Sequence, residues 1–131
     1  MQLRKLLLML ILLTVINARA EWILVCSDAE YSSYLDFSTI ENSGDFLRIW
    51  HLLNFKSLQL IADTPNRSVE ILWEMDCGGD RSRNLSSIWH ADEMGGGSIN
   101  YSDSISTDWK NNTPGTLSQH LWFVMCSTAF I

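Results

Sequence analysis

Short runs in which apolar and polar residues alternate follow one another along most of the chain after residue 20. Alternation of this kind, rich in β-branched and aromatic residues and bounded by turn residues, is typical of strands with one buried face. We expect strands over residues 21–27, 31–37, 46–55, 68–77, 83–90 and 98–101. The third of these segments is apolar on both faces, which predicts a central position in the sheet.

The fourth segment alternates most regularly. The residues that we expect to face the core are Val69, Ile71, Trp73, Met75 and Cys77, and the carboxylates that we expect to face water are Glu70, Glu74 and Asp76. Residues typical of turns or chain breaks separate several of the segments, at Ser43-Gly44, Thr64-Pro65-Asn66 and Gly78-Gly79.

The last segment changes to a helical period. Pro114-Gly115 forms a turn, and Thr116 followed by Gln119 fits a capping box. The apolar residues Leu117, Leu121 and Val124 then recur at helical spacing. Little of this helix could face water, so it must lie on the sheet. The predicted fold is therefore α+β, with an antiparallel meander of about six strands and one C-terminal α-helix packed on it.

The N-terminus has the three-part layout of a cleavable secretory signal. A basic pair, Arg4 and Lys5, precedes an apolar run over residues 6–16, and Ala18-Arg19-Ala20 supplies the small residues of a cleavage site. A spanning helix needs about 20 apolar residues, and this run is shorter. We expect a signal peptide over residues 1–20, cleavage after Ala20, and an exported domain over residues 21–131 without a membrane span. The compartment would be the periplasm, the medium or the cell surface.

Cleavage would change the charge of the chain. The full sequence has nine basic and fifteen acidic residues and a net charge of −6. The exported domain would lose three basic residues and no acidic ones, which leaves a net charge of −9. Such a surface repels nucleic acid and anionic lipid, so neither is an expected partner.

Three cysteines are an odd number for an oxidising compartment, where one bridge and one remaining thiol are expected. Position favours Cys77 with Cys126, because Cys77 faces the predicted core and Cys126 lies near the end of the helix that must cover it. Cys26 shares a strand face with Trp22 and Leu24, which predicts a buried free thiol.

No constellation for catalysis is visible. His51, His90 and His120 lie one per element, without the spacing of a metal site. The glycines at residues 95–97 lack the Lys-Ser/Thr pair of a phosphate loop, and no nucleophile elbow occurs. We expect no catalytic residues, no metal and no cofactor.

Trp109 is unusual because it lies in a polar loop, between Asp108 and Lys110. An exposed tryptophan can anchor a partner or stack on a sugar ring. The alternative is that it folds back to cover the sheet, since large apolar residues are usually covered.

Several short motifs, taken in order, resemble the surface-adhesin protein E family of bacterial envelope proteins. They are Glu21-Trp22, residues 46–50, residues 74–77 with Arg81 and Arg83, and Trp109 leading to Pro114-Gly115-Thr116 and Cys126. The resemblance implies a six-stranded antiparallel sheet with a C-terminal helix tied back by a cysteine pair, here Cys77 with Cys126. It implies no catalytic residues, and the named member of the family is an adhesin that binds host extracellular proteins. This chain departs from the family in its extra Cys26 and in lacking a lipobox.

Two functions are therefore open. One is an exported, non-enzymatic binding module with a protein or glycan partner, for which Trp109 is the candidate contact. The other is a structural or accessory envelope protein without a dedicated ligand.

Overall fold

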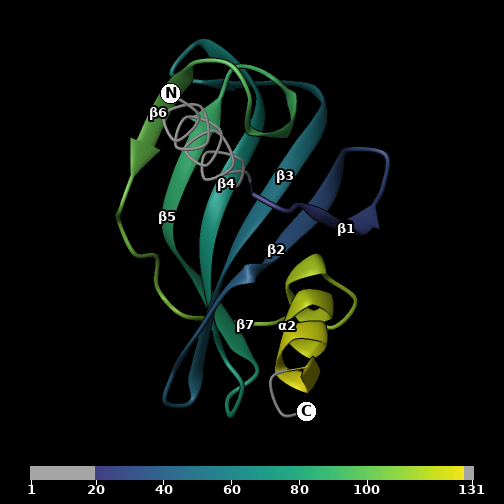
Figure 1. Cartoon of the computed structure of the whole chain (residues 1–131), viewed down its shortest axis with the longest axis vertical. Coiled ribbons are helices and arrows are strands. Elements are labelled where there is room, and N and C mark those ends of the chain that lie inside the picture. Colours follow the sequence, from purple (N-terminus) through teal and green to yellow (C-terminus); the bar gives the residue numbers. More distant parts are fainter. Residues whose placement is uncertain (1–19, 129–131) are drawn as a thin grey trace, which may run out of the picture.

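The structure, a computed structural model, describes residues 20–128. Six strands form one antiparallel sheet in chain order: β1 (Ile23–Ser27), β2 (Tyr31–Ser43), β3 (Phe46–Ile61), β4 (Thr64–Asp76), β5 (Arg81–His90) and β6 (Ile99–Asp103). A short 3-10 turn, η1 (Glu93–Gly95), follows β5, and the two-residue strand β7 (Lys110–Asn111) also pairs with β5. The helix α2 (Leu117–Thr128) lies against the lower part of the sheet (Figure 1). The predicted α+β fold and its meander are confirmed, whereas the predicted signal peptide lies outside the described residues except for Ala20.

All strands except β1 are longer than their patterns predict, most of all around the turn from β3 to β4. The predicted break at residues 64–66 is wrong, because β4 already begins at Thr64 and Pro65 pairs with Leu60. The turn lies instead at Ala62 and Asp63, which both adopt the left-handed conformation with φ of 50° and 63°. Two successive left-handed residues suit the twist of a two-residue hairpin, but glycine or asparagine usually marks such a turn. Proline is tolerated near the start of a strand.

The helix completes the core by covering one face of the sheet. Its buried residues Leu121, Met125 and Cys126 pack with a cluster from β2, β3 and β4 that consists of Leu35, Leu47, Ile49, Trp73 and Met75. The indole N–H of Trp122 donates to the carbonyl oxygen of Asp76 at 2.8 Å. Phe123 lies on the outer side and is 64% exposed. The prediction that the helix lies on the sheet is confirmed.

A disulfide between Cys77 and Cys126 ties the helix to the end of β4, as predicted, with a Cα–Cα distance of 5.5 Å. The bridge joins residues 49 apart in sequence. Closing a loop of that length removes unfolded-state entropy and contributes about 4 kcal/mol to stability in the chain-entropy model.

The third cysteine remains a free thiol, as predicted, but it is half-buried instead of buried. The ladder between β1 and β2 is irregular between Leu24 and Cys26, so simple alternation does not hold along β1. Leu24, expected on the same face as Cys26, is 55% exposed.

The start of the helix departs slightly from the predicted capping box. The backbone N–H of Gln119 donates to the Thr116 hydroxyl at 3.4 Å, as expected. The side-chain oxygen of Gln119 accepts from the backbone N–H of Gly115 at 3.0 Å, one residue further back than the standard box.

Candidate functional site

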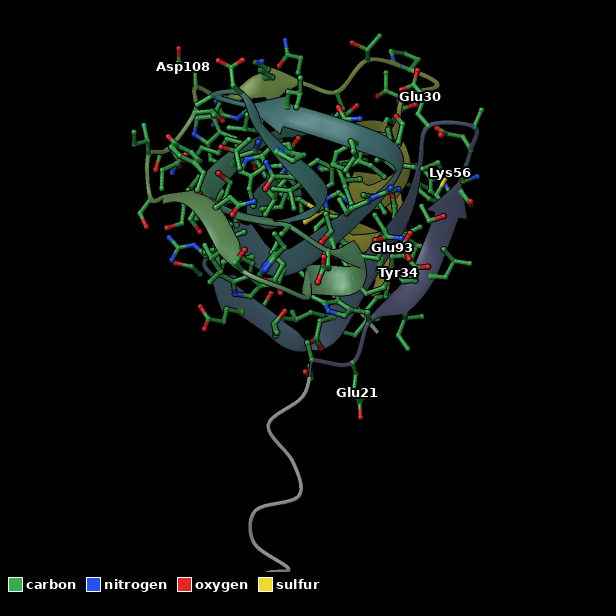
Figure 2. The ribbon with its side chains drawn as sticks, turned by 90° about the horizontal axis from the view of Figure 1, so that it is seen from above. Glu21, Glu30, Tyr34, Lys56, Glu93 and Asp108 are labelled. Atoms are coloured by element: carbon green, nitrogen blue, oxygen red, sulfur yellow. A yellow bond between two sulfur atoms is a disulfide. The ribbon has the colours of Figure 1, made fainter. Side chains whose placement is uncertain are left out.

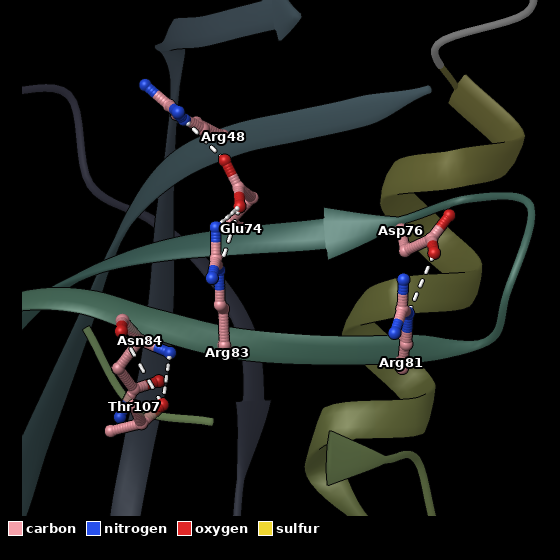
Figure 3. Close-up of polar contacts among 7 residues, drawn as sticks. All are labelled: Arg48, Glu74, Asp76, Arg81, Arg83, Asn84 and Thr107. Carbon is pink, nitrogen blue, oxygen red and sulfur yellow. Dashed lines mark hydrogen bonds and ion pairs between the residues drawn. The ribbon is translucent and has the colours of Figure 1, made fainter. Parts of the chain in front are cut away.

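Two of the three carboxylates predicted to face water on β4 are instead buried, with Glu74 0% and Asp76 8% exposed. The third, Glu70, is half-buried. Glu74 lies opposite Arg48 of β3 on one side and Arg83 of β5 on the other. Its Oε2 accepts from Arg48 Nε at 2.6 Å, and its Oε1 accepts from Nε and a terminal nitrogen of Arg83 at 2.9 and 2.7 Å (Figure 3). The prediction failed because two arginines at matching register positions reach over the carboxylate, which makes its burial tolerable.

The charge of Glu74 is stable in this setting. Burial raises the pKa of its carboxyl group, but hydrogen bonds and positive charge from Arg48 and Arg83 outweigh burial and leave the pKa below its ordinary value. Glu74 is therefore ionised and its oxygens are occupied, which is typical of a structural ion pair.

Trp109 closes the same cluster. The guanidinium carbons of Arg81 and Arg83 lie 4.7 and 4.4 Å from the centroid of its ring, and the Phe46 ring lies at 5.1 Å. Arg81 in turn pairs with Asp76 at 2.8 Å (Figure 3). These contacts show that Trp109 folds back over the sheet and is half-buried, with cation–π contacts to both arginines. Its role as a partner contact remains a prediction.

The loop that carries Trp109 is held to β5 by backbone contacts. The Thr107 N–H donates to the Asn84 carbonyl oxygen at 2.9 Å, and the Asn84 N–H donates to the Thr107 hydroxyl at 3.0 Å (Figure 3). The position of Trp109 is therefore fixed by its own ring contacts and by the hydrogen bonds between Thr107 and Asn84.

The structure does not bring the three histidines together. His51 is 1% exposed in the core and stacks on Trp73 with 4.7 Å between the ring centroids. His90 pairs with Glu70 at 2.8 Å, and His120 is exposed on the helix. Within residues 20–128, no group of three or more histidines, cysteines and carboxylates is arranged to hold a metal ion.

A different set of residues forms an open surface. Four aromatic side chains cross the sheet in one row, which we call the aromatic row: Tyr31 of β2, Phe55 of β3, Trp89 of β5 and Tyr101 of β6. Tyr31 lies opposite Phe55, and their ring centroids are 6.1 Å apart. Phe55 stacks on Trp89 at 5.9 Å with nearly parallel planes, and Trp89 lies opposite Tyr101. Offset and edge-on pairs of this kind stabilise one another by about 1 kcal/mol.

The register places the aromatic row on the same face as α2, because Tyr31 shares its strand face with Leu35 and Phe55 shares its own with Ile49. The helix packs on the lower part of this face (Figure 1). Three members of the row are half-buried, and Tyr101 is 44% exposed. The rings of Tyr31, Phe55 and Trp89 thus hold one another in place, while the outer surface of the row remains accessible.

The charges around the row are distinct from those of the Glu74 cluster. Arg67 lies on the same face by strand alternation, and within residues 20–128 no carboxylate lies within ion-pair distance of it. Asp28 begins the turn before Tyr31 and accepts from its backbone N–H at 3.0 Å. Burial raises the pKa of the Tyr31 phenol, and the negative charges of Asp28 and Glu30 raise it further. Tyr31 is therefore a neutral hydroxyl that can donate a hydrogen bond.

Sequence reasoning missed the row because Tyr31, Phe55, Trp89 and Tyr101 each fall within a separate predicted strand. Each aromatic residue is unremarkable in its own segment. The pairing register joins them, and no single segment of the sequence contains that register.

Taken together, these features define a small single-sheet α+β domain with a disulfide-tied helix and an accessible aromatic surface. Within residues 20–128 no helix is long and apolar enough to cross a membrane.

The family model of surface-adhesin protein E matches residues 22–127, and the chain belongs to this family. The structure of Haemophilus influenzae protein E is similar, with 14% identity and a TM-score of 0.65 over 86% of this chain and 88% of that chain. A second crystal form of that protein gives 14% identity and a TM-score of 0.69 over 88% and 94% of the two chains. At such identities the likeness shows a shared fold. No curated protein sequence matches the chain.

Proposed function

We propose that this protein is an exported, non-enzymatic binding module that contacts a protein or glycan partner through the aromatic row. The observation that carries the proposal is the row itself, in which three rings are fixed by mutual contacts, Tyr101 lies opposite Trp89 in the ladder, and all four are accessible on one side. Rigid aromatic side chains lose little entropy on binding and stack on sugar rings or on apolar side chains. Membership of a family described as a surface adhesin supports the same reading.

Charge adds specificity to this surface. The exported domain, if cleaved after Ala20, has a net charge of −9, so a basic partner would be attracted over a distance and would bind less tightly as salt rises. Arg67 beside the row offers a local donor for a carboxylate or hydroxyl of the partner. Binding of this kind uses neither metal nor cofactor.

The test is a binding screen of residues 21–131 against arrayed glycans and extracellular matrix proteins. Tyr101→Ala and Arg67→Ala should each weaken binding about tenfold, because aromatic and arginine side chains dominate interface energetics. Phe123→Ala removes an exposed aromatic from the outer side of α2 and is the matched control. Its affinity should equal that of the parent.

Trp109→Ala separates this proposal from the contact predicted on sequence grounds. A folded Trp109→Ala protein that binds as well as the parent supports the row. If Trp109→Ala folds but no longer binds, and Tyr101→Ala still binds, then the contact site is the Trp109 loop. If the parent binds nothing in the screen, the accessory role without a dedicated ligand becomes the better reading.

A further inference from the structure

Asp36 of β2 is a nearly buried carboxylate, with 3% of the residue exposed. Its Oδ1 accepts from the backbone N–H of Ser38 at 3.1 Å and from the Ser38 hydroxyl at 2.5 Å. Its Oδ2 accepts from the backbone nitrogen of Glu21 at 3.2 Å. Within residues 20–128 no lysine, arginine or histidine pairs with this carboxylate, although a buried charge ordinarily needs a partner of opposite sign.

The surroundings of Asp36 favour a cation. An open cavity of about 220 Å³ lies between the start of the described chain and the sheet, and its lining includes Ala20, Trp22, Asp36, Trp50 and Glu70. Two carboxylates therefore face this cavity, and no lysine or arginine within residues 20–128 lines it. Glu21 lies at the outer edge of the domain (Figure 2), and both Ala20 and Glu21 are exposed.

We propose that cleavage of the Ala20–Glu21 bond supplies the missing cation, and that the new α-ammonium group of Glu21 forms an ion pair with Asp36. The inference rests on the predicted cleavage after Ala20. In the hydrolysis, water adds to the Ala20 carbonyl carbon and the C–N bond breaks. The carboxylate stays on the released peptide, and the Glu21 nitrogen takes up a proton to become an ammonium group. The nitrogen already at 3.2 Å from Asp36 thereby gains a positive charge without having to move.

Export processing then has a structural consequence. Before cleavage, Asp36 receives one neutral amide hydrogen bond at Oδ2, and after cleavage it receives a charge-assisted one, which is roughly twice as strong. The exported domain is more stable than its precursor, and its N-terminus is tied to β2 beside Trp22.

The experiment compares four purified proteins. One begins at Glu21, and a second carries glycine and serine before Ala20, so that the Glu21 nitrogen stays an amide. Each is also made with Asp36→Asn. The equilibrium constant of unfolding in denaturant should be about tenfold lower for the chain that begins at Glu21 than for the extended chain. In the Asp36→Asn pair this ratio should fall below about twofold.

Equal stability of the two parent chains would overturn the proposal, as would a tenfold ratio that survives Asp36→Asn. If the Asp36→Asn proteins do not fold, NMR titration of the Glu21 amine decides the matter. A pKa above that of an ordinary N-terminus supports the ion pair, and an ordinary or lower pKa overturns it. N-terminal sequencing of exported protein tests the cleavage site independently of the ion pair. A first residue other than Glu21 refutes the cleavage itself, whereas the four-protein comparison shows separately whether Asp36 holds an ammonium group.

Discussion

Acid sensitivity should be centred on His51, a histidine that the fold keeps neutral in its core. The side chain stacks on Trp73, and neither ring nitrogen has a hydrogen-bond partner within the described structure. Burial lowers the pKa of His51 from 6.5 to about 4. No carboxylate compensates for the charge that a proton would bring.

The sign and size of the effect follow from proton linkage. The unfolded chain binds a proton at His51 near pH 6.5, whereas the folded chain does so only near pH 4. The stability that the neutral His51 contributes is therefore fully present above pH 6.5 and is lost as the pH drops from 6.5 towards 4. The full loss is about 3 kcal/mol, at 1.36 kcal/mol for each unit of pKa difference. Between about pH 7.5 and pH 5.5 the loss should be about 1.3 kcal/mol.

The assay is urea unfolding of residues 21–131 at these two pH values, in the parent and in His51→Phe. Glu74 does not interfere, because its folded pKa lies below the ordinary value of 4.5 and it remains largely ionised in both states across this range. The parent should lose about 1.3 kcal/mol more than His51→Phe as the pH falls. His120→Asn, at an exposed histidine, is the control and should follow the parent.

A His51→Phe protein with the same loss as the parent would refute the assignment of acid sensitivity to His51. His51→Leu guards against overpacking by the larger phenyl ring, and both variants should give the same flattened pH dependence. A parent whose stability does not change between the two pH values would show that the core opens enough to hydrate the imidazole.

Two further predictions concern the covalent and ionic ties of the fold. Replacing Cys77 and Cys126 together with serine should lower the unfolding free energy by about 4 kcal/mol, measured by denaturant unfolding. Cys26→Ser should change the unfolding free energy by less than about 0.5 kcal/mol, because that thiol is half-buried and unbridged. If Cys26→Ser costs as much as the double replacement of Cys77 and Cys126, the loop-closure argument is wrong. Glu74→Gln should cost about 2 kcal/mol, since two arginines lose their buried counter-charge but can still reach water. A neutral Glu74→Gln variant would show that the cluster adds no net stability.

The meander could be predicted from the sequence because it depends on local signals. Alternation with a period of two, turn residues and one helical segment are each contained within about ten residues. The turn at Ala62 and Asp63 could not be predicted, because both residues adopt the left-handed conformation. Aspartate tolerates that conformation but alanine does not favour it, and no glycine or asparagine marks the turn. Pro65 nearby gave a stronger but misleading signal.

The sites could be predicted less well because they depend on pairs distant in sequence. Glu74 alternates as an outward carboxylate should, but its burial results from Arg48, which is 26 residues away, and from the covering Trp109 loop. The disulfide was predictable because both cysteines follow from local patterns that point to one core. The aromatic row requires the full register of β2, β3, β5 and β6, which no local pattern contains.

The relative lengths of helix and strands explain why one part of the sheet is open to a partner. The 12 residues of α2 extend about 18 Å at 1.5 Å per residue. The 16 residues of β3 extend about 53 Å at 3.3 Å per residue. The helix is therefore about a third as long as the longest strand. Its bridge at Cys126 and the Trp122 hydrogen bond to Asp76 fix it at the end of the sheet away from the row. On the opposite face, the Glu74 cluster is closed by Trp109, and η1 donates from Met94 to Asn54 and from Gly95 to Ser68. The aromatic row is thus the part of this face where apolar rings remain open, and this is the surface that we propose a partner contacts.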